Sequence, residues 1–250
     1  MAPQFNPKRI GHFIYRDLVL LKGTLITSLS VAGGALFLFS LFAMIRDKNL
    51  TDGEFTGIFG LFYILTGLVF TFAIFREAQH KKMDHLYFAL PVSPLERLIG
   101  AWFATTVLYT LLFSIVAPLI GQFAILVGSV VFGANFHLLS LFQEAYWQVV
   151  KVYFFIHPVF LLGAIAFGKN RVGKTLLFLV LLVLGVLFYN MLLYGILNHG
   201  HGVFDDDALA SYAFDSAKSD FVGAGIVLFA GILGPVLLLT AYVKMVEKEV

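Results

Sequence analysis

The sequence predicts an all-helical integral membrane protein. Hydrophobic residues make up 60% of the 250 residues and charged residues only 13%, and the mean hydropathy is +0.90. Soluble domains average roughly 45–50% apolar and about 25% charged residues, so a single water-soluble core would not hide this much apolar surface. The apolar runs are about 20 residues long, which suits helices that cross a bilayer rather than the short strands of a barrel. We therefore expect a single transmembrane domain over residues 1–250.

The first expected element is an amphipathic helix within residues 1–22 that lies in the membrane interface. Apolar residues from Ile10 to Leu21 share one helical stripe, and basic residues from Lys8 to Arg16 share another. The apolar run at 25–45 is too long for the core of a cleavable signal peptide. We interpret this run as the first span.

Five further spans are expected, which makes six transmembrane helices in all. Each covers about 20 residues, enough to cross about 30 Å of hydrocarbon. Pro118 predicts a kink or a break in span three, and His157-Pro158 is expected to interrupt span four. These spans are expected at residues 55–75, from 94 past 118, at 149–167, at 175–196 and at 222–243.

Basic residues gather in alternate connecting segments, and this pattern orients the bundle. Most of the 17 Lys and Arg lie before residue 23, within 76–97, within 169–174 and near the C-terminus, whereas acidic residues gather in the other segments. Cytoplasmic segments of membrane proteins carry an excess of Lys and Arg. The prediction is a multi-pass protein of the cell membrane with both termini in the cytoplasm. The segment 197–221 is then an extracytoplasmic loop.

The polar segment 76–97 between spans two and three is central to the prediction. Ser93 can cap a helix, Pro94 suits its first position, and Glu96 can complete a capping box. A membrane helix arrives, a short polar element turns on the surface, and a new helix starts at a fixed place. That arrangement would suit a docking site for a partner. The alternative is a solvated loop followed by a well-capped helix.

Two outer segments differ from each other in kind. Residues 129–148 are aromatic and nearly uncharged, which favours a short helix in the outer interface. The loop after span five carries His199, His201 and Asp205, which are plausible ligands for a divalent cation. A solvated loop is the favoured interpretation, because no fixed spacing or helix orients these side chains, so no metal site is assigned.

Residues 168–175 satisfy the pattern G-x-x-x-x-G-K-[ST]. A phosphate-binding loop of this kind needs a strand before it and a helix after it. Here a membrane span precedes the pattern, and no later strand supplies an acidic magnesium ligand. A basic cytoplasmic loop is the favoured interpretation.

No Asp, Glu, Arg or Lys lies near the middle of a predicted span, which disfavours an ion-coupled carrier. The polar residues within the predicted spans that could have a functional role are Gln122, His157 and Asn190. The ring of His157 would satisfy backbone groups at a kink, and Asn190 would form a hydrogen bond between helices. No nucleophile with a base and no paired carboxylates occur within the spans, so an intramembrane enzyme is disfavoured. The absence of Cys excludes disulfides. Neither a cofactor nor nucleic acid is expected.

The layout resembles the permease subunit of type-2 ABC transporters, the ABC-2 family. Members have an N-terminal interfacial helix, six spans, cytoplasmic termini and a short cytoplasmic coupling helix between spans two and three. The local match begins with Phe75-Arg76-Glu77 and continues with Leu90-Pro91-Val92-Ser93-Pro94-Leu95-Glu96-Arg97. It is similar to the family's acidic start and its L-P-V-S-R-x-E-like exit into span three. Pro94 stands where the family commonly has a basic residue.

The resemblance implies an exporter subunit that is not itself an enzyme. Such permeases pair as homo- or heterodimers within membrane lipid and rest on separate cytoplasmic ABC ATPase subunits, with substrate moving along a path lined by spans one, two and five. The residues implied in ATPase docking are Arg76, Glu77, Lys81, Lys82, Asp84, Leu86, Tyr87, Phe88, Glu96 and Arg97.

Two other classes of function remain open from the sequence. A passive channel or carrier would produce flux with the purified chain alone in liposomes. A membrane scaffold or anchor would have partners but no flux. The sequence contains no residue pattern that identifies a substrate.

Overall fold

The computed structural model describes residues 5–79, 87–140, 142–197 and 229–248. This part of the chain is helical and contains no strand, and five of its helical segments are long and apolar enough to cross a membrane. The prediction of an all-α, multi-pass membrane protein is confirmed. The long helices are α1 (Pro7–Asp47), α2 (Asp52–Ile74), α4 (Pro94–Phe103), α5 (Tyr109–Phe132), α6 (Glu144–Ala166), α7 (Arg171–Leu197) and α9 (Gly234–Glu247), and the short turns are η1 (Glu77–Gln79), η2 (Ala104–Leu108) and η4 (Phe229–Leu233).

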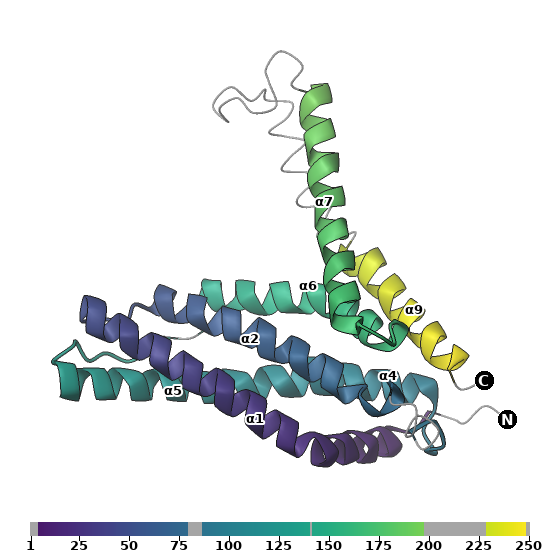
Figure 1. Ribbon diagram of the computed structural model, residues 1–250, viewed down its shortest axis with the longest axis horizontal. Coiled ribbons are helices and arrows are strands. Elements are labelled where there is room, and N and C mark those ends of the chain that lie inside the picture. The colour runs from purple at the N-terminus through teal and green to yellow at the C-terminus, as the bar shows by residue number, and fades with distance from the viewer. Residues whose placement is uncertain (1–4, 80–86, 141, 198–228, 249–250) are drawn as a thin grey trace.

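The helices α1, α2, α5 and α6 form an elongated bundle, and α7 leaves it steeply where α6 ends (Figure 1). Within the bundle α1 packs against α2 and α5, while α6 packs against α2 and α9. Both ends of the described chain lie at the same end of the bundle. We call this the basic end, because the start of α1, the ends of α2, α6 and α9, and the start of α4 bring their Lys and Arg residues there.

The helix α1 is continuous, and it joins two elements that the sequence analysis treats separately. Its 41 residues span about 60 Å at 1.5 Å per residue, about twice the thickness of the hydrocarbon core. The expected interfacial helix is therefore the N-terminal part of one long, curved helix (Figure 1). Asn6 caps the helix by accepting a hydrogen bond from the Lys8 amide, and no proline or cap interrupts it further on. Both ends of α1 thus extend beyond the hydrocarbon.

Neither of the two prolines at which a kink or an interruption was expected breaks its helix. The α5 helix continues through Pro118 and α6 continues through Pro158. The irregularity of span three lies instead in the wide π turn η2, which joins α4 to α5. There the Thr105 carbonyl accepts a hydrogen bond from the Tyr153 hydroxyl at 2.7 Å. Membrane helices tolerate proline when neighbouring groups satisfy the freed backbone, and they widen where side chains from other helices compete for it.

The connection after α5 also differs from the sequence-based expectation. Gly133, with φ of +62°, ends α5, and residues 133–140 contain no helix. The side chain of Gln122 donates a hydrogen bond to the His137 carbonyl and accepts one from the Leu139 amide, at 3.0 and 3.1 Å. The expected short interfacial helix at 129–148 is therefore replaced by the end of α5, a strap held against α5, and the start of α6. Extended backbone beside a membrane bundle needs such partners, which explains the polar residue at position 122.

An aromatic core lies where α2, α5 and α6 meet. Tyr63 is fully buried, and its ring centroid lies 4.9 Å from that of Tyr153 and 5.4 Å from that of Tyr109. The absence of a side chain at Gly67 permits this approach, since a Cβ there would lie 2.6 Å from the Tyr153 ring. The inner faces of the bundle are therefore packed with rings rather than lined by charges.

Several expected features lie outside the described residues. They include part of the sixth expected span at 222–243, of which Gly234 onward is helical, and the loop 197–221 with His199, His201 and Asp205. The side chain of Asn190 also lies outside them.

Candidate functional site

Glu96 lies at the centre of the contact between α1 and the start of α4, at the basic end. Its side chain is 0% exposed. One carboxylate oxygen accepts hydrogen bonds from the Asn6 amide at 2.7 Å and from the Arg9 guanidinium at 2.8 Å. The other accepts from the Ser93 amide at 2.9 Å, while the Ser93 hydroxyl accepts from the Glu96 amide. The capping box at Ser93 is thus present, and the same carboxylate also holds the N-terminus of α1.

The charged form of Glu96 is strongly favoured. Because Glu96 lies level with Asn6 and Arg9, at the first turn of the α1 helix, it is outside the membrane-spanning part. Burial alone would raise its pKa, but the hydrogen bonds from Ser93, Asn6 and Arg9 outweigh burial and lower the pKa to about 2. Glu96 therefore stays ionised at physiological pH and acts as a permanent tie between the two helices.

Arg97 organises the short stretch that precedes α4. It is 1% exposed, and its guanidinium donates hydrogen bonds to the carbonyls of Phe88 and Leu90 at 2.9 and 3.0 Å. The same group lies 5.4 Å from the ring centroid of Tyr87 and 5.5 Å from that of Phe88. Tyr87 in turn packs edge-on against Phe13 of α1. These contacts fix the end of the polar segment against α1 and α4.

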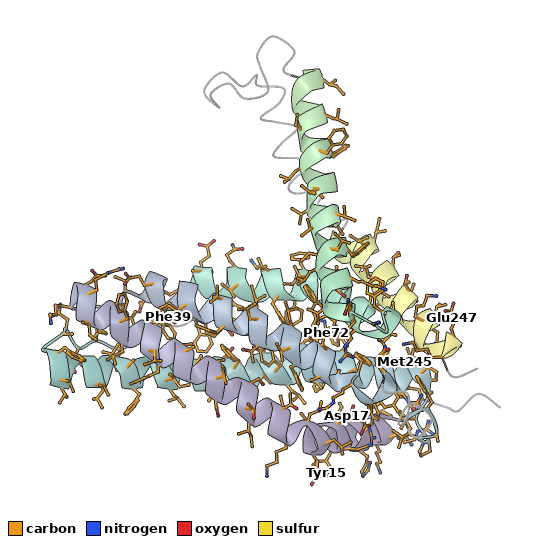
Figure 2. All side chains as sticks on the ribbon, viewed as in Figure 1. Tyr15, Asp17, Phe39, Phe72, Met245 and Glu247 are labelled. Carbon is orange, nitrogen blue, oxygen red and sulfur yellow. The ribbon has the colours of Figure 1, made fainter. Side chains whose placement is uncertain are left out.

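A second ionic contact joins α1 to η1, the turn that follows α2. Arg16 donates a hydrogen bond to Asp17 at 2.8 Å and another to Glu77. Asp17 is 5% exposed, and among the described residues its Oδ2 atom has no hydrogen-bond partner. Tyr15 points away from the bundle, whereas Asp17 points into it (Figure 2). The inward face of α1 thus presents one carboxylate to the interior.

The pKa of Asp17 is raised well above that of an ordinary aspartate. Asp17 precedes the apolar run at 25–45 and lies outside the membrane-spanning part of α1. Burial is the main cause that raises its pKa, Arg16 opposes burial, and the charge of Glu77 adds to it; together these effects raise the pKa to about 7. Asp17 is therefore close to half-ionised at neutral pH.

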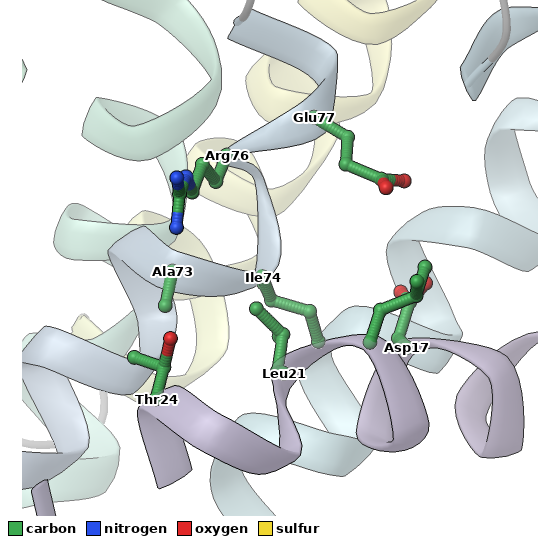
Figure 3. Close-up of a pocket in the computed structure, with 8 residues that line it drawn as sticks. Asp17, Leu21, Thr24, Ala73, Ile74, Arg76 and Glu77 are labelled. Carbon is green, nitrogen blue, oxygen red and sulfur yellow. The ribbon is translucent and has the colours of Figure 1, made fainter. Parts of the chain in front are cut away.

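A cavity of about 240 Å³ lies between α1 and the end of α2 (Figure 3). In this view the carboxylates of Asp17 and Glu77 lie on one side and the Arg76 guanidinium lies on the other. The side chains of Leu21 and Thr24 line it from α1. The cavity therefore carries opposite charges on its two sides.

A groove of about 770 Å³ continues from the cavity along the same two helices. It is lined between Gly23 and Ala32 on α1 and between Phe62 and Val69 on α2, and Thr24 lines both spaces. Most of its lining side chains are apolar. The polar cavity thus has a largely apolar groove next to it along α1 and α2.

The residues expected to dock an ATPase fall into three groups. Lys81, Lys82, Asp84 and Leu86 lie outside the described residues. Arg76 is exposed, and Glu77 and Phe88 are half-buried. Tyr87, Glu96 and Arg97 are buried inside the chain. Arg9, Phe13 and nearby carbonyls contact these three side chains, and their part in docking an ATPase stays a prediction.

Sequence reasoning missed the three residues of α1 that complete the site, Arg9, Arg16 and Asp17. A signal for Asp17 was present, because it follows Ile10 and Phe13 at helical spacing and so falls on the inward stripe. Nothing in the sequence pairs Arg9 with Glu96 or Arg16 with Glu77, which lie 87 and 61 positions away.

The pattern at 168–175 does not form a phosphate-binding loop. The preceding element is the helix α6, and no strand occurs in the described part of the chain. Lys174 and Thr175 already belong to α7, where the Thr175 hydroxyl is buried and donates to the Arg171 carbonyl at 2.7 Å. That hydroxyl is therefore not directed at a ligand.

His157 is fully buried between α6 and the π turn η2. Its Nε2 atom lies 2.8 Å from the Thr105 hydroxyl. Because α6 continues through Pro158, the ring does not satisfy backbone groups at a kink, as the sequence suggested. It links two helices through a hydroxyl instead.

Comparisons with protein-family models, with curated proteins and with solved structures give no match for this chain. Its function is therefore argued from the geometry of the basic end and from the sequence pattern at 75–97.

Proposed function

We propose that this chain is the membrane-spanning permease subunit of an ATP-driven transporter of the ABC-2 type, powered by a separate cytoplasmic ATPase. The multi-pass helical body and the sequence pattern at 75–97 support the proposal. One observation carries it: both ends of the polar segment are tied by ion pairs to the same helix, α1. Arg16 binds Glu77 at the start of the segment, and Arg9 binds Glu96 at its end.

These ties give the segment a way to move the bundle. Gln79 donates hydrogen bonds to the carbonyls of Ala164 and Ile165 at 3.0 and 2.9 Å, so the start of the segment also holds the end of α6. A push on the segment would therefore reach α1, α4 and α6 together. Since Glu96 is buried and the other three paired side chains are partly buried, the push would move the helices rather than deform the loop.

The finer layout of the proposal follows the family resemblance. It has six spans, with α7 as the fifth and the segment that ends in α9 as the sixth, and the first turns of α1 in the interface. Both termini and the basic end face the cytoplasm, as the excess of Lys and Arg there supports. The coupling helix would lie within 77–90, and Lys81, Lys82, Asp84 and Leu86 would face the ATPase together with Arg76.

A second permease copy is part of the proposal. Large apolar side chains of α7 are exposed along its described length, from Val172 to Ile196. A helix that is apolar all round is stable only against lipid or another protein. Substrate would then cross the membrane between two copies, next to α1, α2 and α7.

The test is gentle native purification of the tagged full-length chain from its own cells. An ATPase should co-elute, and the complex should contain two permease copies. Glu77→Arg should lower co-eluting ATPase activity at least about tenfold, since it sets two cations side by side. The double change Arg16→Glu with Glu77→Arg should restore much of it. Arg46→Glu, at the opposite end of α1, is the matched control and should change nothing.

Two results would contradict the proposal. One is a wild-type complex that contains no ATP-hydrolysing chain under conditions that keep other membrane complexes intact. The other is flux produced in liposomes by the purified chain alone, which would favour a passive carrier.

A further inference from the structure

Asp17 lines the cavity, and one of its two carboxylate oxygens is buried without a hydrogen-bond donor from the part of the chain that the structure describes. Asp17 is 5% exposed, and its Oδ2 atom has no hydrogen-bond partner among the described residues. Buried polar atoms are almost always satisfied by protein, water or ligand. The cavity holds about 240 Å³, whereas one water occupies about 30 Å³ in the liquid. There is room for a hydrogen-bond donor considerably larger than a single water.

The opposite side of the cavity carries a cation. Arg76 is exposed, and no described side chain accepts a hydrogen bond from its guanidinium. In Figure 3 this group lies apart from the carboxylates of Asp17 and Glu77. Guanidinium groups bind phosphate with two parallel hydrogen bonds, and carboxylates accept hydrogen bonds from ammonium groups. A ligand that carries a phosphate and an ammonium group a few bonds apart would match both sides.

The apolar groove next to the cavity identifies the rest of the ligand. It is lined over residues 23–32 of α1 and 62–69 of α2, a length of about 13 Å along the helix. Thr24 lines both the groove and the cavity, so the two spaces are neighbours along α1. A hydrocarbon chain in the groove would lie at a depth where the bilayer itself is apolar.

We propose that the space between α1 and α2 is a binding site for a phospholipid with a primary-amine headgroup, such as phosphatidylethanolamine. The ammonium group donates to Asp17, the phosphate binds Arg76, and one acyl chain lies in the groove. The inference does not depend on the proposed transport function. Choline lipids would bind less well, because a trimethylammonium group has no N–H donor for Asp17. Phosphatidylglycerol would bind less well, because its headgroup lacks the cation.

The test is competition between lipids for the full-length chain, read by native mass spectrometry. The purified chain in detergent is mixed with equal amounts of phosphatidylethanolamine and phosphatidylcholine of distinguishable mass. We expect one retained phosphatidylethanolamine per chain, preferred over phosphatidylcholine at least about fivefold. Asp17→Asn should abolish the preference, because the amide offers its own donor in place of a negative charge. Asp47→Asn is the matched control, since it changes the same side chain at the other end of α1.

A second variant tests the cavity without changing charge. Ala73 lines the cavity from α2, and Ala73→Leu should fill it and lower the retained phosphatidylethanolamine at least about fivefold. Thermal unfolding of each variant is recorded beside the binding, and an effect seen only in an unfolded variant counts as no effect. Equal retention of the two lipids by the wild type would overturn the proposal, as would a preference that survives both Asp17→Asn and Ala73→Leu.

Soluble competitors distinguish binding of the whole lipid from binding of its headgroup alone. Phosphoethanolamine and inorganic phosphate are each added in excess to the loaded wild-type chain. Retained lipid should persist, because the acyl chain contributes binding that neither competitor has. Displacement of the lipid by inorganic phosphate would mean a simple anion site and would overturn the proposal.

Discussion

At the scale of single residues, two capping boxes of the same chemistry serve different purposes. Thr51 and Glu54 cap α2 at one end of the bundle, and Ser93 and Glu96 cap α4 at the other. Glu54 is partly exposed, whereas Glu96 is fully buried and also binds the Asn6 amide and Arg9. The sequence predicts both caps equally well. Only the fold turns one of them into a connection between helices.

This contrast predicts different costs for the same substitution. Glu96→Gln should lower the free energy of unfolding by about 1.5–3 kcal/mol, the range for hydrogen bonds to a buried charged group. Glu54→Gln should cost less than about 1 kcal/mol, as for an exposed pair. Denaturant or thermal unfolding in detergent measures both. Equal costs would show that Glu96 acts as a cap alone. Because the pKa of Glu96 falls from 4.5 to about 2 on folding, its contribution should be fully present above pH 4.5 and lost as the pH falls through 2.

Asp17 predicts a pH dependence of the opposite sign. Its pKa rises from 3.8 to about 7 on folding, so the folded chain binds more protons between these values, and stability falls as the pH rises through that window. The charged and titratable groups near Asp17 are Arg16, Glu77 and Tyr87, with Arg76 across the cavity.

Between pH 5 and pH 8, in detergent without added lipid, the wild type should lose about 2 kcal/mol relative to Asp17→Asn. Thermal unfolding of the two proteins at both pH values measures this difference. Asp47→Asn provides the comparison, because Asp47 is exposed and pairs with Arg46. Parallel pH curves for the wild type and Asp17→Asn would contradict the prediction.

At the scale of helices, the sequence predicts well that a given segment is a membrane-spanning helix. It does not predict where the regular turns of that helix are interrupted. Hydropathy and charge place α1, α2, α5, α6 and α7 correctly, because about 20 apolar residues have few alternatives in a bilayer. Pro118 and Pro158 look like breaks because local rules treat the chain as isolated. The irregularity occurs at Thr105 instead, since its partner Tyr153 comes from another helix. No local pattern reveals such a partner.

The junction of α6 and α7 depends on a glycine, which gives a prediction at this scale. A Cβ at Gly163 would lie 1.9 Å from the Thr175 hydroxyl and 2.6 Å from its methyl carbon. Gly163→Ala should therefore push α7 away from α6 and cost about 1–3 kcal/mol by overpacking. A Cβ at Gly185 of α7 would meet nothing within 4 Å, so Gly185→Ala should be neutral or stabilise by up to about 1 kcal/mol. Thermal unfolding distinguishes the two. If Gly163→Ala proves as stable as Gly185→Ala, the close packing of α6 on α7 is not required.

At the scale of the whole molecule, charge separates the two ends of the bundle. The basic end gathers the start of α1, the end of α6 and the end of α9, where Lys248 donates a hydrogen bond to the Ile165 carbonyl at 2.6 Å. The sequence predicted this end and its cap at Ser93. It could not predict the cavity or the pairing of Glu77 and Glu96 with α1, because these contacts depend on how distant segments pack.

The orientation of this charge separation can be measured directly, because the chain has no cysteine. Lys8 and Lys169 lie at the basic end and Asp47 lies at the other, and all three are exposed. Cell membranes retain Lys and Arg on the cytoplasmic side, and the 41 residues of α1 reach from one side to the other. A membrane-impermeant maleimide should label Asp47→Cys in intact cells. It should label Lys8→Cys and Lys169→Cys only after the cells are permeabilised. The cysteine-free wild-type chain gives the background labelling. Labelling of Lys8→Cys in intact cells would put the polar segment 76–97 outside the cell, where no ATPase could reach it.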